Sequence, residues 1–184
     1  MTSVTTPLLP KVIHIIAMHY NVEIKARCTD LNKVRRILRT RDAREIGLDH
    51  QVDTYFRVPH GRLKLREGNI ENSLIHYRRP DQPGPKTSEV ALYTSAPKTS
   101  LKEVLSAALE VWKVVDKKRE IYFIDNVKFH LDDVQHLGTF VEIEAIDREG
   151  TLGLAHLREQ CAYYLRMLEI STNDLIDQSY SDLI

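Results

Sequence analysis

The segment NVEIKAR, residues 21–27, alternates charged and aliphatic side chains. Glu23, Lys25 and Arg27 are two residues apart, and an aliphatic residue separates each from the next. Because successive side chains of a β-strand point to opposite faces, the three charges share one face and the aliphatic residues share the other. If the aliphatic face belongs to the core, the charged face must border either the surface or a cavity.

The same alternation returns in later runs of the sequence, with cations on some runs and carboxylates on another. The charged residues that share a face within a run are Arg62, Lys64 and Arg66 in RLKLRE, Lys117 and Arg119 in KKREIYFI, and Glu142 and Glu144 in TFVEIEAI. An antiparallel sheet with one face in water is the simpler interpretation. The segregation of the two signs favours a site instead, because a basic wall facing carboxylates suits a polyphosphate and its divalent metal. The sequence has no glycine-rich phosphate loop, so side chains would have to bind the phosphates.

Turn residues divide the sequence into short β-rich runs and a few amphipathic segments. Strands are predicted over residues 21–27, 51–58, 61–67, 73–79, 88–95, 119–125, 127–134 and 138–147, and helices over 29–40, 99–115 and about 154–168. The second helix starts with a Ser100/Glu103 capping box, and the runs between 51 and 95 read as an antiparallel meander. About eight strands is the number at which a closed barrel leaves room for side chains or one small ligand. We therefore predict an α+β fold, a closed eight-stranded antiparallel β-barrel with helices packed outside.

Length and charge set the limits of this prediction. The chain has 184 residues, enough for one compact domain, which we place at residues 18–184. Residues 1–17 are expected to be an N-terminal extension, with an extra edge strand as the alternative. The 26 basic and 26 acidic residues cancel, so we expect no nucleic acid and no membrane as partner. The two cysteines have no CxxC spacing, and a reducing, cytoplasmic setting is the default expectation.

An ordered set of segments resembles one known family. NVEIKAR, QVDTYF, GRLKLRE, LIHYRRPDQPGPK, DKKREIYFIDNVKFHLDDVQHLGTFVEIEAI and QSYSDLI are similar to the CYTH superfamily of triphosphate tunnel metalloenzymes, from about Tyr20 to the C-terminus. The resemblance is strongest to class IV, CyaB-type adenylyl cyclase-like proteins, whose relatives include thiamine triphosphatases and inorganic tripolyphosphatases. It implies a tunnel of eight antiparallel strands that holds a triphosphate lengthwise, with Mg²⁺ or Mn²⁺ as cofactor.

The segment NVEIKAR takes the place of the ExExK motif of this family. Glu23 matches the second glutamate and Lys25 matches the lysine, whereas Asn21 stands where the first glutamate is expected. An amide oxygen can ligate a hard cation but adds no negative charge. The departure therefore leaves the number of bound metals open.

The resemblance also implies roles for residues outside this motif. The implied metal ligands are Glu23, Glu142 and Glu144, and the implied catalytic cations are Lys25, Arg66, Lys117 and Arg119. The implied triphosphate-binding residues are these four cations together with Arg27, Arg62, Lys64, Arg79 and Lys86. Strand parity does not choose between Arg78 and Arg79, and Arg79 is preferred. Asp132 matches an acidic position near the metal or the ribose, and Tyr55 is either a partner of Lys25 in activating water or a structural tyrosine.

Three functions are compatible with these features. An adenylyl cyclase-like enzyme would convert ATP to cyclic AMP and pyrophosphate, and a thiamine triphosphatase or inorganic tripolyphosphatase would hydrolyse its triphosphate. A binding module without turnover is the third alternative, and Asn21 is its main support. In each case the expected partner is a small-molecule triphosphate, namely ATP, thiamine triphosphate or tripolyphosphate. The sequence leaves a homodimer open.

Overall fold

The computed structural model describes residues 18–80 and 84–184. In chain order its elements are β1 (Met18–Arg27), α1 (Leu31–Thr40), β2 (Arg44–Phe56), β3 (Arg62–Gly68), β4 (Ser73–Arg78), β5 (Lys86–Thr94), α2 (Leu101–Ala108), β6 (Val111–Ile124), β7 (Val127–Val134), β8 (Gly138–Asp147), α3 (Leu154–Met167), the 3-10 helix η1 (Thr172–Asp174) and α4 (Tyr180–Leu183). The predicted extension at residues 1–17 lies outside the described residues.

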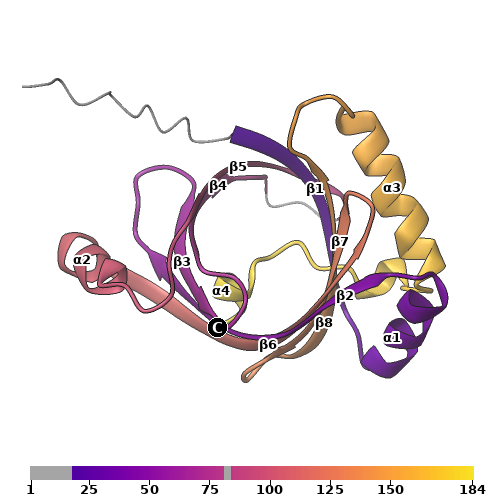
Figure 1. The fold of residues 1–184 in the computed structure, drawn as a ribbon, viewed down its shortest axis with the longest axis horizontal. Coiled ribbons are helices and arrows are strands. Elements are labelled where there is room, and N and C mark those ends of the chain that lie inside the picture. The colour runs from indigo at the N-terminus through magenta and orange to yellow at the C-terminus, as the bar shows by residue number, and fades with distance from the viewer. Residues whose placement is uncertain (1–17, 81–83) are drawn as a thin grey trace, which may run out of the picture.

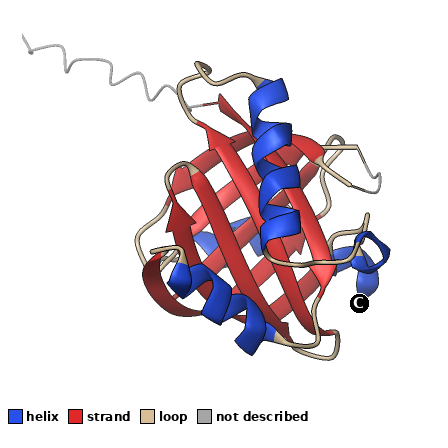
Figure 2. Cartoon of the chain, turned by 90° about the vertical axis from the view of Figure 1, so that its right-hand side faces the viewer, coloured by secondary structure: helices blue, strands red, loops and turns tan. Residues whose placement is uncertain are grey.

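Within the described part of the chain, eight strands form one closed antiparallel barrel in the order β1-β5-β4-β3-β2-β6-β7-β8 (Figure 1). Strands β2 to β5 pair in succession, as a meander does. Strand β1 closes the barrel between β5 and β8. Helices α1 and α3 lie against the outside of the wall (Figure 2). The predicted closed eight-stranded antiparallel barrel is confirmed.

The two faces of the barrel wall differ in chemistry. The aliphatic residues of β1 and β8 point outward, where Val22, Ile24 and Ile143 are at most 2 % exposed. They pack with Leu38 of α1 and Leu157 of α3. Each such side chain contributes about 1.5–3 kcal/mol when it is fully buried. The largest hydrophobic core therefore lies between the barrel and its helices, and the charged residues of the same strands face the interior.

Helix α2 is shorter than the sequence pattern predicts. It ends at Ala108, Leu109 has extended dihedral angles (φ −131°, ψ 149°), and β6 begins at Val111. The prediction of a helix as far as residue 115 was wrong because the valines after Leu109 pair with β2, and strand pairing overrides helical periodicity. The predicted capping box was also wrong, since the side chain of Ser100 makes no capping hydrogen bond.

Four strands begin earlier than predicted. Strand β1 starts at Met18 rather than at residue 21. Strand β2 starts at Arg44 rather than at residue 51, and β5 starts at Lys86 rather than at residue 88. Strand β6 starts at Val111 rather than at residue 119. The first half of β2 has few apolar residues, so local alternation does not show it, yet it pairs with β6 from Arg44 onward.

The C-terminal segment covers one end of the barrel. After η1 the chain returns to β1, where Leu175 forms a bridge with Ala26 and the amide of Ile176 donates to the carbonyl of Lys25 at 2.9 Å. Helix α4 follows, and Tyr180 at its start is 4 % exposed. Figure 1 shows this segment, in yellow, crossing the barrel opening. Among the described residues no helix is both long enough and apolar enough to cross a membrane.

Candidate functional site

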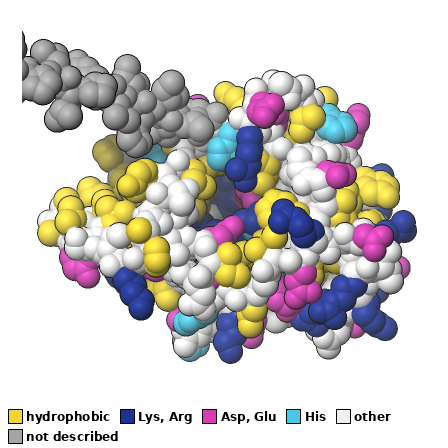
Figure 3. Space-filling view, viewed as in Figure 1, with side chains coloured by type: hydrophobic (Ala, Val, Ile, Leu, Met, Phe, Trp, Pro, Cys, Tyr) yellow, Lys and Arg dark blue, Asp and Glu magenta, His cyan; other side chains and the backbone are white. Residues whose placement is uncertain are grey.

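A cavity of about 470 Å³ lies inside the barrel. The space-filling view shows it as a central hollow with dark blue basic side chains at its floor (Figure 3). Its wall is charged on the side of β1, β3, β6, β7 and β8, and it is largely apolar on the side of β4 and β5, where Ile75, Val90 and Leu92 line it. The cavity is therefore polar on one side and apolar on the other.

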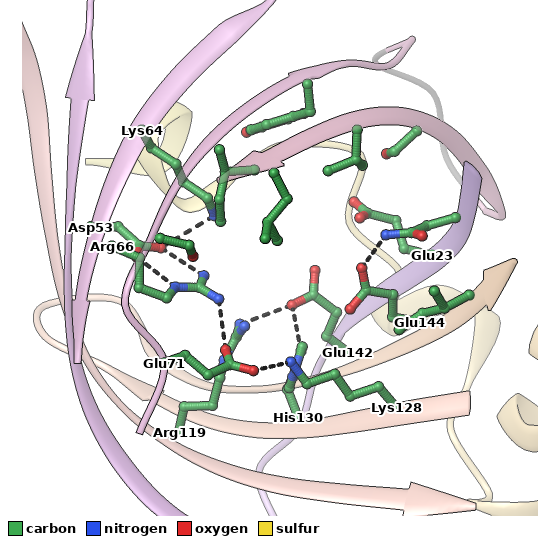
Figure 4. Close-up of a pocket in the computed structure, with 18 of the residues that line it drawn as sticks. Glu23, Asp53, Lys64, Arg66, Glu71, Arg119, Lys128, His130, Glu142 and Glu144 are labelled. Carbon is green, nitrogen blue, oxygen red and sulfur yellow. Dashed lines mark hydrogen bonds and ion pairs between the residues drawn. The ribbon is translucent and has the colours of Figure 1, made fainter. Parts of the chain in front are cut away.

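Glu142 of β8 is the centre of one charge cluster (Figure 4). Its carboxylate lies 3.1 Å from the Lys25 ammonium, 2.9 Å from the Arg119 guanidinium and 3.1 Å from Nδ1 of His130. Burial raises the pKa of Glu142, but Lys25, His130 and Arg119 outweigh it and hold the pKa well below its usual range. Glu142 is therefore ionised at neutral pH and bridges β1, β6 and β7.

Asp53 of β2 is the centre of a second cluster. Arg66 donates to it twice, at 2.8 and 3.0 Å, and Lys117 and Lys64 contact it at 2.6 and 3.3 Å. Burial is the largest single effect on the pKa of Asp53 and would raise it. The three cations together outweigh burial and hold this pKa well below its usual range. Burial lowers the pKa of Lys117 to about 7, helped by the nearby arginines. Lys117 lies behind Asp53 rather than at the cavity wall.

Asp132 of β7 lies inside the barrel behind Arg119, without lining the cavity itself. Both carboxylate oxygens accept hydrogen bonds from Arg119 at 2.6 Å, and the Tyr180 hydroxyl donates to Asp132 at 2.7 Å. Asp132 is fully buried and is separated from the cavity by these partners. Its place in the structure is that of a residue that positions Arg119.

Glu23 and Glu144 face each other across the β1–β8 pair. Glu23 forms an ion pair with Arg79, and the Asn21 amide donates to Glu144. Within residues 18–80 and 84–184, the Asn21 oxygen is buried without a hydrogen-bond partner. Oxygen donors of this kind are the ones that Mg²⁺ and Mn²⁺ prefer.

These donors fit a metal that is bound together with its substrate. Among the described residues, no group of three or more His, Cys, Asp or Glu is arranged to hold a metal ion. Mg²⁺ commonly uses one or two carboxylates together with substrate phosphates rather than a cage of protein ligands. Glu23, Glu144 and the Asn21 oxygen meet that requirement.

The remaining predicted phosphate-binding residues lie toward the end covered by the C-terminal segment. Lys86 donates to the Ile176 carbonyl at 3.1 Å, and burial together with Arg79 and Lys25 lowers its pKa to about 8. Arg62 donates to the Ser179 hydroxyl at 2.6 Å. These contacts hold the cationic end of the cavity and the C-terminal segment together.

For two arginines of the predicted set, the structure shows a position that strand parity alone does not determine. Arg79 points inward, with its side chain 4 % exposed, whereas Arg78 is exposed. Arg27 shares the parity of Lys25 but lies beyond the cavity, where it contacts the Phe140 ring and the Leu137 carbonyl. The structure thus brings Arg79 to the cavity and leaves Arg27 outside it.

Tyrosines surround the cations at this end. Tyr55 lines the cavity, and the Lys64 ammonium lies 5.6 Å from the centre of its ring. Burial raises the pKa of Tyr55 above its usual range. The Lys25 ammonium lies over the ring of Tyr180, 4.0 Å from its centre. Tyr180, which the sequence analysis did not single out, is therefore the aromatic neighbour of the motif lysine.

Several further residues of the site were not singled out from the sequence. In VKFHLDDV, Lys128 and His130 share the parity of Asp132, and both line the cavity. Among the described residues, Nε2 of His130 is buried without a partner. Burial, with Arg119 and Lys128, lowers the pKa of His130 to about 4. Because Glu142 accepts from Nδ1, the neutral ring has Nε2 as an acceptor.

Comparisons with known proteins agree with this geometry. The sequence profile of the CYTH domain matches residues 19–180. A protein of Methanocaldococcus jannaschii described as a candidate adenylate cyclase is 27% identical over 176 residues, which are 88% of this chain and 97% of the relative.

Solved structures share the fold. A Pyrococcus horikoshii protein has a TM-score of 0.73 at 23% identity, covering 89% of this chain and 99% of that one. A Hippeastrum protein described as a candidate adenylyl cyclase with a dominant triphosphatase activity has a TM-score of 0.55 at 13% identity, covering 89% of this chain and 93% of that one. At these identities the structures establish the fold alone.

Proposed function

This chain belongs to the CYTH family, and on that premise we propose that it binds ATP with Mg²⁺ or Mn²⁺ inside its barrel and converts it to cyclic AMP and pyrophosphate. Triphosphate tunnel enzymes of this family depend on a metal ion in general. The cyclase reaction is supported by the relative from M. jannaschii, which is described as a candidate adenylate cyclase.

The observation that carries the proposal is the set of buried cations around one cavity. Arg66 and Arg119 are 6 % and 3 % exposed, and Lys25 is 6 % exposed. Isolated buried charges are costly, and a cluster of them that lines a cavity indicates a function for their field. A triphosphate carries the complementary charge and the oxygen acceptors that such donors require.

The proposed reaction needs positioning and charge stabilisation rather than a covalent intermediate. The ribose 3′-hydroxyl attacks the α-phosphorus, the bond from this phosphorus to the oxygen bridging to the β-phosphate breaks, and pyrophosphate leaves with the proton of the hydroxyl. Lys25, Arg66, Arg79 and Arg119 bind the phosphate oxygens and stabilise the charge that develops on the leaving group. Lys117 holds Asp53, which in turn fixes Arg66.

Glu23, Glu142 and Glu144 are the carboxylates that would hold the metal, which neutralises phosphate charge when it is bound. In the described structure Glu142 is held by Lys25 and Arg119, and Glu23 is held by Arg79. A phosphate chain would offer these cations new anionic partners. The carboxylates would then be released for the metal.

One observation favours hydrolysis as a second candidate function. His130 lines the cavity, and burial keeps its imidazole neutral at neutral pH, the form that can act as general base toward an attacking water. A triphosphatase would use the same cations for thiamine triphosphate or tripolyphosphate. A binding module without turnover is the third alternative, and it is supported by Asn21 in the ExExK motif.

A single product analysis tests the three alternatives. Purified protein is incubated with Mg²⁺ or Mn²⁺ and, separately, with ATP, thiamine triphosphate and tripolyphosphate, and the products are resolved by ³¹P NMR and chromatography. We expect cyclic AMP and pyrophosphate from ATP. Orthophosphate with the matching diphosphate would replace the cyclase by a hydrolase, and binding without product would leave the binding module.

We also propose a cytoplasmic location, because both cysteines carry free thiols and free thiols are usual in a reducing compartment.

A further inference from the structure

The turn between β3 and β4, residues 68–72, brings a carboxylate into the cavity (Figure 4). Glu71 accepts hydrogen bonds from Arg66 at 3.1 Å and from Gln51 at 3.2 Å, and its other oxygen forms an ion pair with Lys128. Glu71 therefore forms ion pairs with two cations that face the cavity, Arg66 and Lys128. Its side chain is 27% exposed, so it lies at the boundary between the cavity and solvent.

Hydrogen bonds with the side chains of Asp49 and Asn72 hold the backbone of this turn in place. Asp49 is fully buried, and its carboxylate accepts hydrogen bonds from the amides of Ile70 and Glu71 at 2.9 and 3.0 Å. The Asn72 side chain donates to the Gly68 carbonyl and accepts from the Gly68 amide, at 2.9 and 3.2 Å. A Cβ at Gly68 would lie 2.8 Å from both oxygens of Asp49. Glu71 is thus presented by a tightly built turn.

Glu71 is the second carboxylate that accepts hydrogen bonds from the guanidinium of Arg66. Two donors of this guanidinium are used by Asp53, and the third contact is with Glu71. Burial raises the pKa of Glu71, but Lys128 and Arg66 outweigh it and hold the pKa below its usual range, so Glu71 is charged at neutral pH. An incoming phosphate at this level meets a fixed negative charge that already occupies the cations.

Glu71 and the C-terminal segment lie at opposite ends of the charged interior. Strand β3 contacts the C-terminal segment near its start, through Arg62 and Ser179, and it leads into the turn at its end, Gly68. The cations between these limits include Lys25, which approaches the C-terminal segment, and Arg66 beside Glu71. The cationic part of the cavity therefore has a limit on each side.

We propose that Glu71 sets the length of the phosphate chain that the cavity accepts, so that the site binds chains of three phosphates and discriminates against longer inorganic polyphosphates. This inference rests on the proposed function. A fourth phosphate would extend to the level of Glu71, where like charges repel. Shorter chains remain among the cations deeper in the barrel.

Isothermal titration of tripolyphosphate and tetrapolyphosphate in metal-free buffer tests the inference, since no turnover is expected without metal. The variant Glu71→Gln keeps the shape of the side chain and removes its charge. The matched control is Glu67→Gln, because Glu67 lies on β3 shortly before the turn, points to the other face and pairs with Lys102 at 3.2 Å. Wild type and control should bind tetrapolyphosphate no more tightly than tripolyphosphate.

For Glu71→Gln we expect the affinity for tetrapolyphosphate to rise about tenfold relative to that for tripolyphosphate, because a like charge next to the fourth phosphate is removed. An equal change for both chains would overturn the inference, since it would mean that Glu71 only holds Arg66 and Lys128 in place. If wild-type protein binds neither chain, in metal-free buffer or with Mg²⁺ added, the proposed function fails and the inference fails with it.

Discussion

The outer and inner faces of strands β1 and β8 show a division of labour within a few residues. On the outer face, Ile24 and Ile143 pack under α1 and α3 in the hydrophobic core. On the inner face, their neighbours Lys25 and Glu142 form an ion pair at the cavity. Burial of apolar side chains on the outer face stabilises the fold. Burial of charged side chains on the inner face costs part of that stability, because the charges lose their contact with water. Substitutions on the two faces should therefore affect different measurements.

The largest effect is expected on the inner face. Glu142→Gln should lower turnover more than about 100-fold, because Lys25, Arg119 and the metal all lose a charged partner. The melting temperature should change less than in a core variant, since the volume of the side chain is kept. Steady-state rates with ATP and Mg²⁺, together with thermal melting, check both statements. Activity within threefold of wild type would remove Glu142 from the site.

The matched variant on the outer face is the next residue, Ile143→Ala. It should lower the free energy of unfolding by about 2–5 kcal/mol, because it removes buried methyl groups and leaves a cavity in the core under the helices. The kcat of the folded protein should stay within a few-fold of wild type at low temperature. Urea unfolding and kcat at 15 °C measure the two effects. A selective loss of kcat without loss of stability would break the division between the faces.

A smaller effect is expected at Asn21, where the inner face departs from the family motif. Asn21→Glu adds a carboxylate beside Glu144 and Glu23, so the Mg²⁺ concentration for half-maximal activity should fall about three- to tenfold. Asn21→Gln, which keeps the amide, is the control. An unchanged Mg²⁺ requirement in both variants would mean that the amide already serves as the ligand that this site needs.

The smallest effect concerns the pH dependence of stability. Lys86 has a pKa of about 8 in the folded protein, whereas an unfolded lysine titrates near 10.4. Between these values the unfolded state binds more protons, so this residue makes stability rise as the pH rises from about 8 to 10. Lys86→Met should flatten that part of the rise. Melting temperatures of both proteins at pH 7.5, 8.5 and 9.5 measure it, and parallel profiles would exclude this titration.

The alternation of charged and aliphatic residues along the strands predicted the fold and part of the site, because it determines the face of the sheet on which each side chain lies. It placed Lys25 and Glu142 on the inner face of their strands, and the structure gives both this position. Alternation does not determine height along the barrel axis. Arg27 shares the parity of Lys25 but lies past the end of the cavity.

Residues outside the strands could not be found by alternation. Glu71 belongs to a turn, where no periodicity predicts direction. Its position depends on hydrogen bonds that the turn amides donate to Asp49 of β2. Tyr180 reaches the site only because the C-terminal segment returns to β1. His130 was within reach of the pattern, since it shares the parity of Asp132, but parity alone does not rank the members of a face.

The C-terminal segment that covers one end of the barrel also bears on the order in which small molecules enter and leave the cavity. Ser179 and Tyr180 are buried at that end, so in the proposed reaction we expect reactant and products to use the opposite mouth. The product that lies deeper would then leave after the shallower one and would compete with the next reactant for the same cations. Slow departure of the deeper product would then limit the rate of the whole cycle.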